Sequence, residues 1–145
     1  MGLNFGIQNF AGSEGLRKVY TFTGANFVHF ERVEAAAHEP WIDNDNGRIK
    51  SESGATTCNF ILPLNFPAGT KIISACVYSA GNAFMWDLIR YDLTADGNLH
   101  IVTGIANNAL GNLSIVMEEQ YCYGILTQSI TNTSTIRGAW VEIIE

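Results

Sequence analysis

The chain has 145 residues, of which 47% are hydrophobic and only 15% charged, and its formal net charge is −6. This length suffices for one domain with a buried core. Lys and Arg are few and nowhere clustered, which argues against binding nucleic acid through its phosphates. No apolar run approaches the roughly 20 residues of a membrane-spanning helix, so we expect no membrane partner.

The first 16 residues differ in composition from the rest. They hold four glycines, with Phe5, Ile7 and Phe10 spaced among polar residues. The segment is too apolar for a solvated tail and too rich in glycine for a helix. We therefore expect an N-terminal arm over residues 1–16, followed by a domain over 17–145. The arm would dock into a groove of its own domain or of a neighbouring subunit, with the three apolar side chains as oligomer contacts.

Short β-strands are predicted over most of the remaining chain. In 56–64, for example, Cys58, Phe60 and Leu62 alternate with side chains that face away, the period-two pattern of a half-buried strand. The segment 84–93 is apolar on both faces, which is typical of a central strand. The predicted strands are 18–23, 26–34, 48–52, 56–64, 70–79, 84–93, 98–103, 112–118, 121–127 and 135–144.

The last predicted strand runs to the final residues, so we expect it to be paired within a sheet. Along it, Ile136 and Trp140 are expected to share one face, and Arg137 the other. Both Trp140 and Trp86 lie in strongly apolar strands, which predicts that they belong to the core.

The connections have the composition of tight turns. In the segment 66–69 (FPAG), the proline restricts its own backbone angle φ, and the glycine can adopt a positive φ. Asp96-Gly97 is a hairpin signal between 84–93 and 98–103. About ten short strands without helical crossovers predict an all-β fold, an antiparallel β-sandwich or jelly roll. An up-and-down barrel is the alternative.

Four of these segments resemble a small β-sandwich domain found in bacterial and phage proteins of unassigned function. That domain has a turn of the type LPDGATI, here 66–72 (FPAGTKI), and a following strand of the type VTVYY, here 75–78 (ACVY). A strand of the type LYRVDL corresponds to 88–93 (LIRYDL), and a closing strand of the type LYGVRIEY to 136–143 (IRGAWVEI). The resemblance implies the sandwich fold and brings no catalytic residues with it.

One set of residues could hold a metal ion. His29 and Glu31 are two apart in a predicted strand and would share a face. With His100 from a distant strand they would form two imidazoles and a carboxylate, the facial triad of non-haem iron oxygenases. The alternative is that His29 and Glu31 form an exposed pair beside Arg32.

The acidic stretch 41–47 (WIDNDNG) supports a different kind of site. Its Asp and Asn oxygens could bind calcium, although Gly47 stands where a third ligand belongs in an EF-hand, and a plain Asx-rich turn is the alternative. Trp41 is predicted to lie in a loop, where its ring could stack on a sugar while Asp43 and Asp45 accept hydrogen bonds from hydroxyl groups. We therefore predict these three residues as a glycan site.

The cysteines and the remaining motifs favour no catalytic chemistry. Cys58, Cys76 and Cys122 each lie in an apolar run, which predicts small core residues and leaves one disulfide open. Neither a GxSxG motif nor a phosphate-binding glycine loop is present, so no catalytic residue is assigned. We expect no cofactor, with calcium or iron as the alternatives.

Three functions follow in order of preference. The first is a non-enzymatic structural or interaction subunit of a homo-oligomeric assembly such as a virion, fibre or cell surface. The second is a carbohydrate-binding module, and the third a metal-dependent jelly-roll enzyme. Because the N-terminus has neither the basic start nor the apolar core of a signal peptide, we expect synthesis as a soluble cytoplasmic chain. Its final location stays open.

Overall fold

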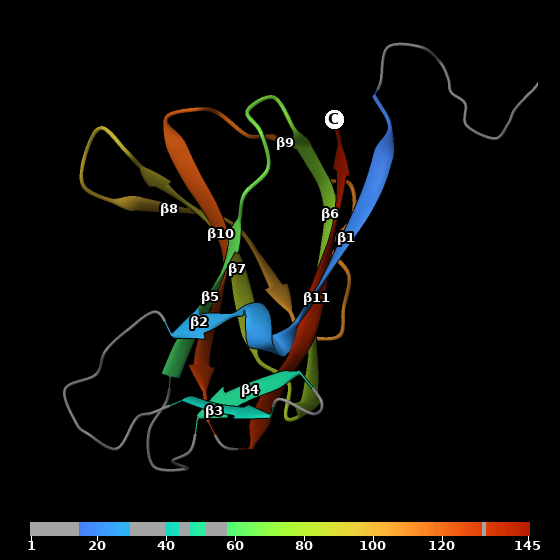
Figure 1. Cartoon of the computed structure of the whole chain (residues 1–145), viewed down its shortest axis with the longest axis vertical. Coiled ribbons are helices and arrows are strands. Elements are labelled where there is room, and N and C mark those ends of the chain that lie inside the picture. The colour runs from blue at the N-terminus through green and yellow to red at the C-terminus, as the bar shows by residue number, and fades with distance from the viewer. Residues whose placement is uncertain (1–14, 30–39, 44–46, 52–57, 132) are drawn as a thin grey trace, which may run out of the picture.

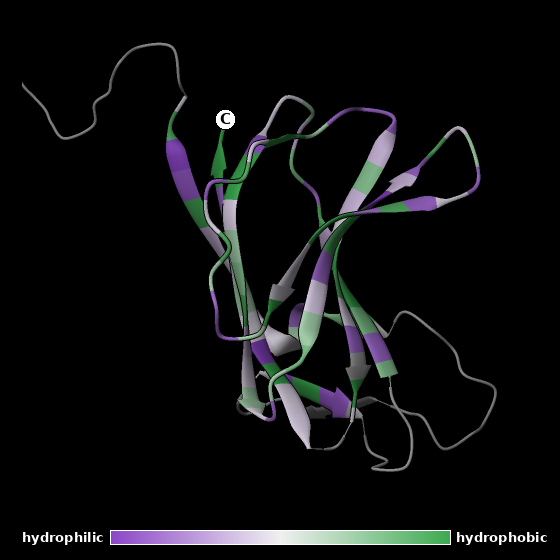
Figure 2. Ribbon diagram, turned by 180° about the vertical axis from the view of Figure 1, so that it is seen from behind, coloured by the Kyte–Doolittle hydropathy of each residue, from purple (hydrophilic) through white to green (hydrophobic). Residues whose placement is uncertain are grey.

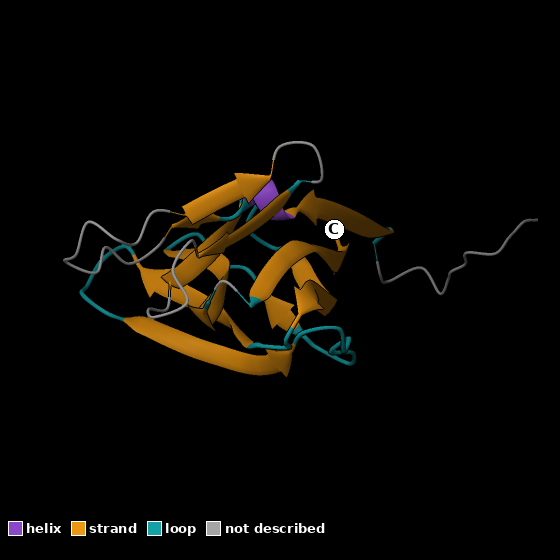
Figure 3. Ribbon diagram, turned by 90° about the horizontal axis from the view of Figure 1, so that it is seen from below, coloured by secondary structure: helices purple, strands orange, loops and turns teal. Residues whose placement is uncertain are grey.

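The computed structural model describes residues 15–29, 40–43, 47–51, 58–131 and 133–145, which form two antiparallel sheets packed face to face (Figure 1; Figure 3). The predicted β-sandwich is therefore confirmed. Within these residues the single helical element is a 3-10 turn, η1 (Gly24–Asn26), and no helix is long and apolar enough to cross a membrane.

Sheet A has six strands in the order β3-β4-β11-β6-β9, with β1 also paired to β11. Its strands are β1 (Arg17–Thr23), β3 (Pro40–Asp43), β4 (Arg48–Ser51), β6 (Lys71–Gly81), β9 (Ile115–Val116) and β11 (Ser134–Ile144). Sheet B has five strands in the order β2-β5-β10-β7-β8. These are β2 (Val28–His29), β5 (Cys58–Leu64), β7 (Met85–Asp92), β8 (Asn98–Ile105) and β10 (Tyr121–Ile130).

From β4 to β11 the chain crosses from one sheet to the other at every connection except the β7–β8 hairpin. Repeated crossing of this kind is the arrangement of a jelly roll. The hairpin has the predicted Asp96-Gly97 turn, and Tyr91 pairs with Asn98 across it. The strand predicted to be central, β7, indeed lies between β10 and β8.

The core fills the space between the sheets. Several strands contribute alternate side chains, such as Phe60, Leu62 and Leu64 of β5, and Figure 2 shows hydrophobic and hydrophilic bands following one another along the strands. Trp86 is the largest side chain in this core and is fully buried, as predicted. Other fully buried members are Phe60, Leu62, Ile72, Leu88, Ile125, Ile136 and Ile143.

Strand β11 lies at the centre of sheet A, which confirms that the final strand is paired. It runs beside β6 along its whole length, from Ser134 opposite Gly81 to Ile144 opposite Lys71. Its other edge is shared, because β1 covers it from Gly138 onward and β4 meets it at Ile136.

Three strand predictions need correction. The strand predicted over 26–34 begins later, because Asn26 belongs to η1 and β2 begins at Val28. Residues 40–43, expected in a loop, form strand β3, which pairs antiparallel with β4 so that Asp43 lies opposite Arg48. Gly47, directly before β4, has a φ of 62°, and residues 44–46 of the acidic stretch lie outside the described residues. The predicted strand 112–118 is reduced to the two residues of β9, and Asn112, with a φ of 57°, is not extended.

Because of a β-bulge, several side chains of β11 lie on the opposite face from the one predicted. The register with β6 shifts between Ile136 and Gly138, so Arg137 is an extra residue on β11. After the shift Ala139 and Val141 belong to the core cluster, whereas Trp140 lies outside it and is only partly buried. Ile136 and Trp140 therefore occupy opposite faces, and the prediction that Trp140 is a core residue was wrong.

We expect Gly104→Ala to destabilise the sandwich. A Cβ atom at Gly104 would lie 2.4 Å from Cε2 of the fully buried Trp86 indole, which has little room to move. Overpacking of this kind costs about 1–3 kcal/mol, and urea unfolding will measure it. Gly111→Ala is the matched control, because a Cβ atom added at Gly111 would have nothing within 4 Å. Equal stability of the two variants would contradict this packing.

Candidate functional site

The outer face of sheet A has a hollow of about 290 Å³ above Gly138, which we call the Gly138 hollow. It forms because Gly138 lies opposite Tyr78 on β6 and opposite Thr23 on β1 without contributing a side chain. The residues that line the hollow are Thr21, Phe22, Tyr78, Ser79, Asn107, Arg137, Gly138, Ala139 and Trp140.

Two aromatic side chains stand at the hollow and hold each other in place. The Trp140 indole Nε1–H donates a hydrogen bond of 3.0 Å to the Tyr78 hydroxyl oxygen. Tyr78 keeps 44% of its surface exposed although it is a large aromatic residue in the middle of a sheet. Because the hydrogen bond restricts both side chains, their rings form a preorganised aromatic surface.

The polar wall of the hollow is also fixed. Asn107 follows β8 with a φ of 70°, and its side-chain Oδ1 accepts a hydrogen bond of 3.0 Å from the Ser79 amide. Its Nδ2 donates at 2.9 Å to the Ser79 hydroxyl oxygen. Ser79 lies opposite Ile136 on β11 and is 7% exposed.

Glycine is required at the floor of the hollow. A Cβ atom at Gly138 would lie 2.3 Å from the Phe22 carbonyl oxygen of β1. Since that oxygen belongs to the backbone, it cannot move aside without displacing β1. The absence of a side chain at Gly138 therefore allows both the close approach of β1 and the space on the outer face.

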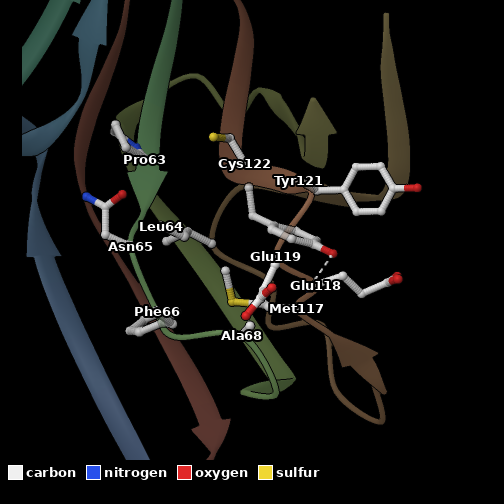
Figure 4. Close-up of a pocket in the computed structure, with 11 residues that line it drawn as sticks. Pro63, Leu64, Asn65, Phe66, Ala68, Met117, Glu118, Glu119, Tyr121 and Cys122 are labelled. Carbon is white, nitrogen blue, oxygen red and sulfur yellow. Dashed lines mark hydrogen bonds between the residues drawn. The ribbon is translucent and has the colours of Figure 1, made fainter. Parts of the chain in front are cut away.

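A second cleft of about 440 Å³ lies at one end of the sandwich (Figure 4). The Tyr123 hydroxyl accepts a hydrogen bond of 3.2 Å from the Glu118 amide and donates one of 3.4 Å to the Val116 carbonyl. The cleft is lined by Pro63, Leu64, Asn65, Phe66, Ala68, Met117, Glu118, Glu119, Tyr121, Cys122 and Tyr123.

One ion pair and one cation–π contact lie beside this end cleft. The Arg90 guanidinium lies 3.9 Å from the centroid of the Tyr121 ring and 3.6 Å from Glu118 Oε1. Tyr121 also borders a smaller hollow of about 210 Å³, where the hydroxyl and amide of Thr94 lower the pKa of Asp92. The contacts of Arg90 link β7 to the start of β10 and to the segment before it.

The outer face of sheet B has a buried carboxylate. Asp87 on β7 is 3% exposed and accepts hydrogen bonds from the Thr103 hydroxyl and the Gln128 side-chain amide. Its Oδ2 also lies 2.9 Å from Nδ1 of His100. The partners come from β8 and β10, so one carboxylate links three strands. Because these hydrogen bonds join neighbouring strands, we interpret the cluster as structural.

The structure does not bring the predicted metal ligands together. His29 on β2 and His100 on β8 lie at opposite edges of sheet B, with three strands between them. Four strand spacings of about 4.8 Å put the two strands roughly 19 Å apart. Glu31 lies outside the described residues. Within the described ranges no group of three or more His, Cys, Asp or Glu could hold a metal ion.

The predicted glycan site is only partly described. Trp41 and Asp43 lie on β3, at the edge of sheet A, so Trp41 belongs to a strand and not to a loop as predicted. Asp45 falls outside the described residues. The predicted oligomer contacts Phe5, Ile7 and Phe10 fall outside them as well.

All three cysteines are free, so no disulfide joins them. Cys58 and Cys76 are buried as expected, and burial raises the pKa of the Cys76 thiol. The prediction that Cys122 is a core residue is wrong, because it lies exposed on the outer face of β10 while its neighbour Tyr123 enters the core.

Sequence reasoning missed the aromatic pair of the Gly138 hollow. Strict alternation from Ile136 places Trp140 in the core, and the bulge interrupts that alternation. A signal was present in the sequence, since a glycine inside a strand, here Gly138, often marks a bulge or a close backbone approach.

Comparison with known proteins adds little to this description. No protein-family model matches the chain, and no curated protein matches it significantly. Among solved structures, it is similar to a GH26-CBM35 β-(1,4)-mannanase of Podospora anserina, at 8% sequence identity and a TM-score of 0.48. The likeness covers 85% of this chain and 27% of that chain, so the chain spans about a quarter of the mannanase's length.

We expect Asp87→Ala to lower the free energy of unfolding by about 1–3 kcal/mol, because hydrogen-bond donors on two neighbouring strands lose their acceptor. Glu119→Ala is the control, since Glu119 is an exposed carboxylate. Urea unfolding of both variants tests the role of the cluster. A loss of stability no larger than that of the control would show that the carboxylate does not link the strands.

Proposed function

We propose that this chain is a non-enzymatic β-sandwich module that binds carbohydrate in the Gly138 hollow. The observation that carries the proposal is the Trp140–Tyr78 pair, two hydrogen-bonded aromatic side chains on the outer face of a sheet, beside polar groups. Aromatic rings bind the apolar C–H faces of sugars, whereas hydroxyl and amide groups fix their hydroxyl groups.

The dimensions and the chemistry of the hollow support this proposal. A volume of about 290 Å³ is near the lower end of small-molecule sites and fits one or two sugar rings. Thr21, opposite Trp140 on β1, adds a hydroxyl group to the lining. Because the walls are held by hydrogen bonds before any ligand arrives, little conformational entropy is lost on binding.

A glycan array with purified protein tests the proposal. We expect Trp140→Ala to weaken binding by about tenfold or more, as truncation of a central aromatic contact does. Trp41→Ala is the matched control, because it removes the tryptophan of the site predicted from sequence. Trp140 is only partly buried, so the variant should stay folded, and urea unfolding checks this. Binding that survives Trp140→Ala but is lost in Trp41→Ala would contradict the proposal.

The second candidate function is that of a subunit in a homo-oligomer. It is favoured by large apolar side chains that are exposed along edge strands. On β1, Val19 is 59% exposed and Tyr20 is 37% exposed, and on the edge strand β8, Leu99 is 50% and Ile105 is 52% exposed. The outer edge of β1 has no strand partner within the described residues. Unpaired edges and apolar groups of this kind favour contact with a second copy.

Deletion of residues 1–12 tests this second function together with the predicted arm. We expect the shortened chain to fold, because the described sandwich begins after the deleted residues, and to form a weaker oligomer. Light scattering at several concentrations measures the assembly mass, and Val19→Lys on the full chain separates the edge of β1 from the arm. A mass unchanged by both alterations would count against the homo-oligomer contacts named here.

A further inference from the structure

We infer that the Gly138 hollow selects sugars that carry a carboxylate, with Arg137 as the residue that recognises it. This inference rests on the proposed function, because it names the ligand class of the same site. The ligand we assign is a uronate residue of an acidic polysaccharide.

The bulge in β11 is what brings Arg137 into the site. In a regular strand Arg137 and Trp140 would point to opposite faces, since they are three residues apart. The extra residue between Ile136 and Gly138 shifts the alternation by one, so both side chains line the same hollow. Bulges are known to redirect side chains in this way and are frequent beside binding sites.

The Arg137 guanidinium has no hydrogen-bond or ion-pair partner within the described residues. Two other basic side chains of the sandwich are paired with carboxylates, Lys18 with Glu145 at 2.6 Å and Arg90 with Glu118. The nearest carboxylate along β11, Glu142, already accepts a hydrogen bond from Ser74 and lies 3.8 Å from Arg17. In a chain of net charge −6, an exposed and uncompensated arginine beside two aromatic rings is a site for an anionic group.

The chemistry of the guanidinium favours a carboxylate. Its planar N–H groups match the two oxygens of a carboxylate in a bidentate hydrogen bond, which a neutral sugar cannot form. A uronate joins that carboxylate to a sugar ring, so Trp140 and Tyr78 would hold the ring while Arg137 holds the charge. A sulfated sugar also offers an anion to the same arginine and has to be distinguished by experiment.

Binding of matched polysaccharides to the full chain tests the inference. The probes are oligomers of galacturonate, glucuronate and mannuronate, their methyl esters, the corresponding neutral oligosaccharides, and dextran sulfate against dextran. By calorimetry we expect the uronates to bind about ten- to a hundredfold tighter than their esters. Arg137→Gln should remove this preference, so that the uronates bind no tighter than their esters.

Lys71→Gln is the matched control, because it removes an equal charge at the far end of β6 from the hollow. Equal binding of uronates and esters, or a preference that survives Arg137→Gln, would overturn the inference while the carbohydrate proposal stands. Tighter binding of dextran sulfate than of every uronate would overturn the assignment of a carboxylate. Binding of none of the probes would overturn the proposed function, and the inference with it.

Discussion

The pairing of β11 with both β1 and β6 is the constraint on which the rest of the structure depends. Backbone hydrogen bonds on both edges place the final strand in the middle of sheet A. The close approach of β1 requires a residue without Cβ at position 138, because the Phe22 carbonyl occupies that space. The bulge beside Gly138 then sets the faces of all later residues of the strand, so Ala139 and Val141 enter the core while Trp140 stays outside.

The two outer faces of the sandwich differ in how their polar groups are used. On sheet B the Asp87 carboxylate is buried and engaged with side chains of β8 and β10, so its hydrogen bonds contribute to stability. Beside the end cleft, Arg90 is likewise engaged, with Glu118 and with the Tyr121 ring. On sheet A the Trp140–Tyr78 pair remains partly exposed and Arg137 is uncompensated within the described residues. The aromatic pair and Arg137 can therefore contact a ligand without giving up bonds that link strands. For this reason we place binding at the Gly138 hollow.

Much of the fold could be predicted from sequence, because period-two alternation and turn chemistry are local signals. The Asp96-Gly97 hairpin and the buried face of 58–64 follow directly from such signals. The face of Trp140 could not be predicted by alternation, since the bulge depends on how β1 and β6 pair with β11 across long sequence separations. The sequence likewise could not show that His29 and His100, predicted to share a metal ion, lie far apart. Only the strand order places them at opposite edges of sheet B.

The most direct test of a ligand at the Gly138 hollow is a titration followed by the indole N–H signals in a ¹H–¹⁵N spectrum. The chain has three tryptophans, and single Trp→Phe variants assign their three signals. We expect an acidic oligosaccharide to shift the Trp140 signal, because its N–H bonds to Tyr78 at the site, and to leave the buried Trp86 signal in place. A shift confined to the Trp41 signal would contradict the account.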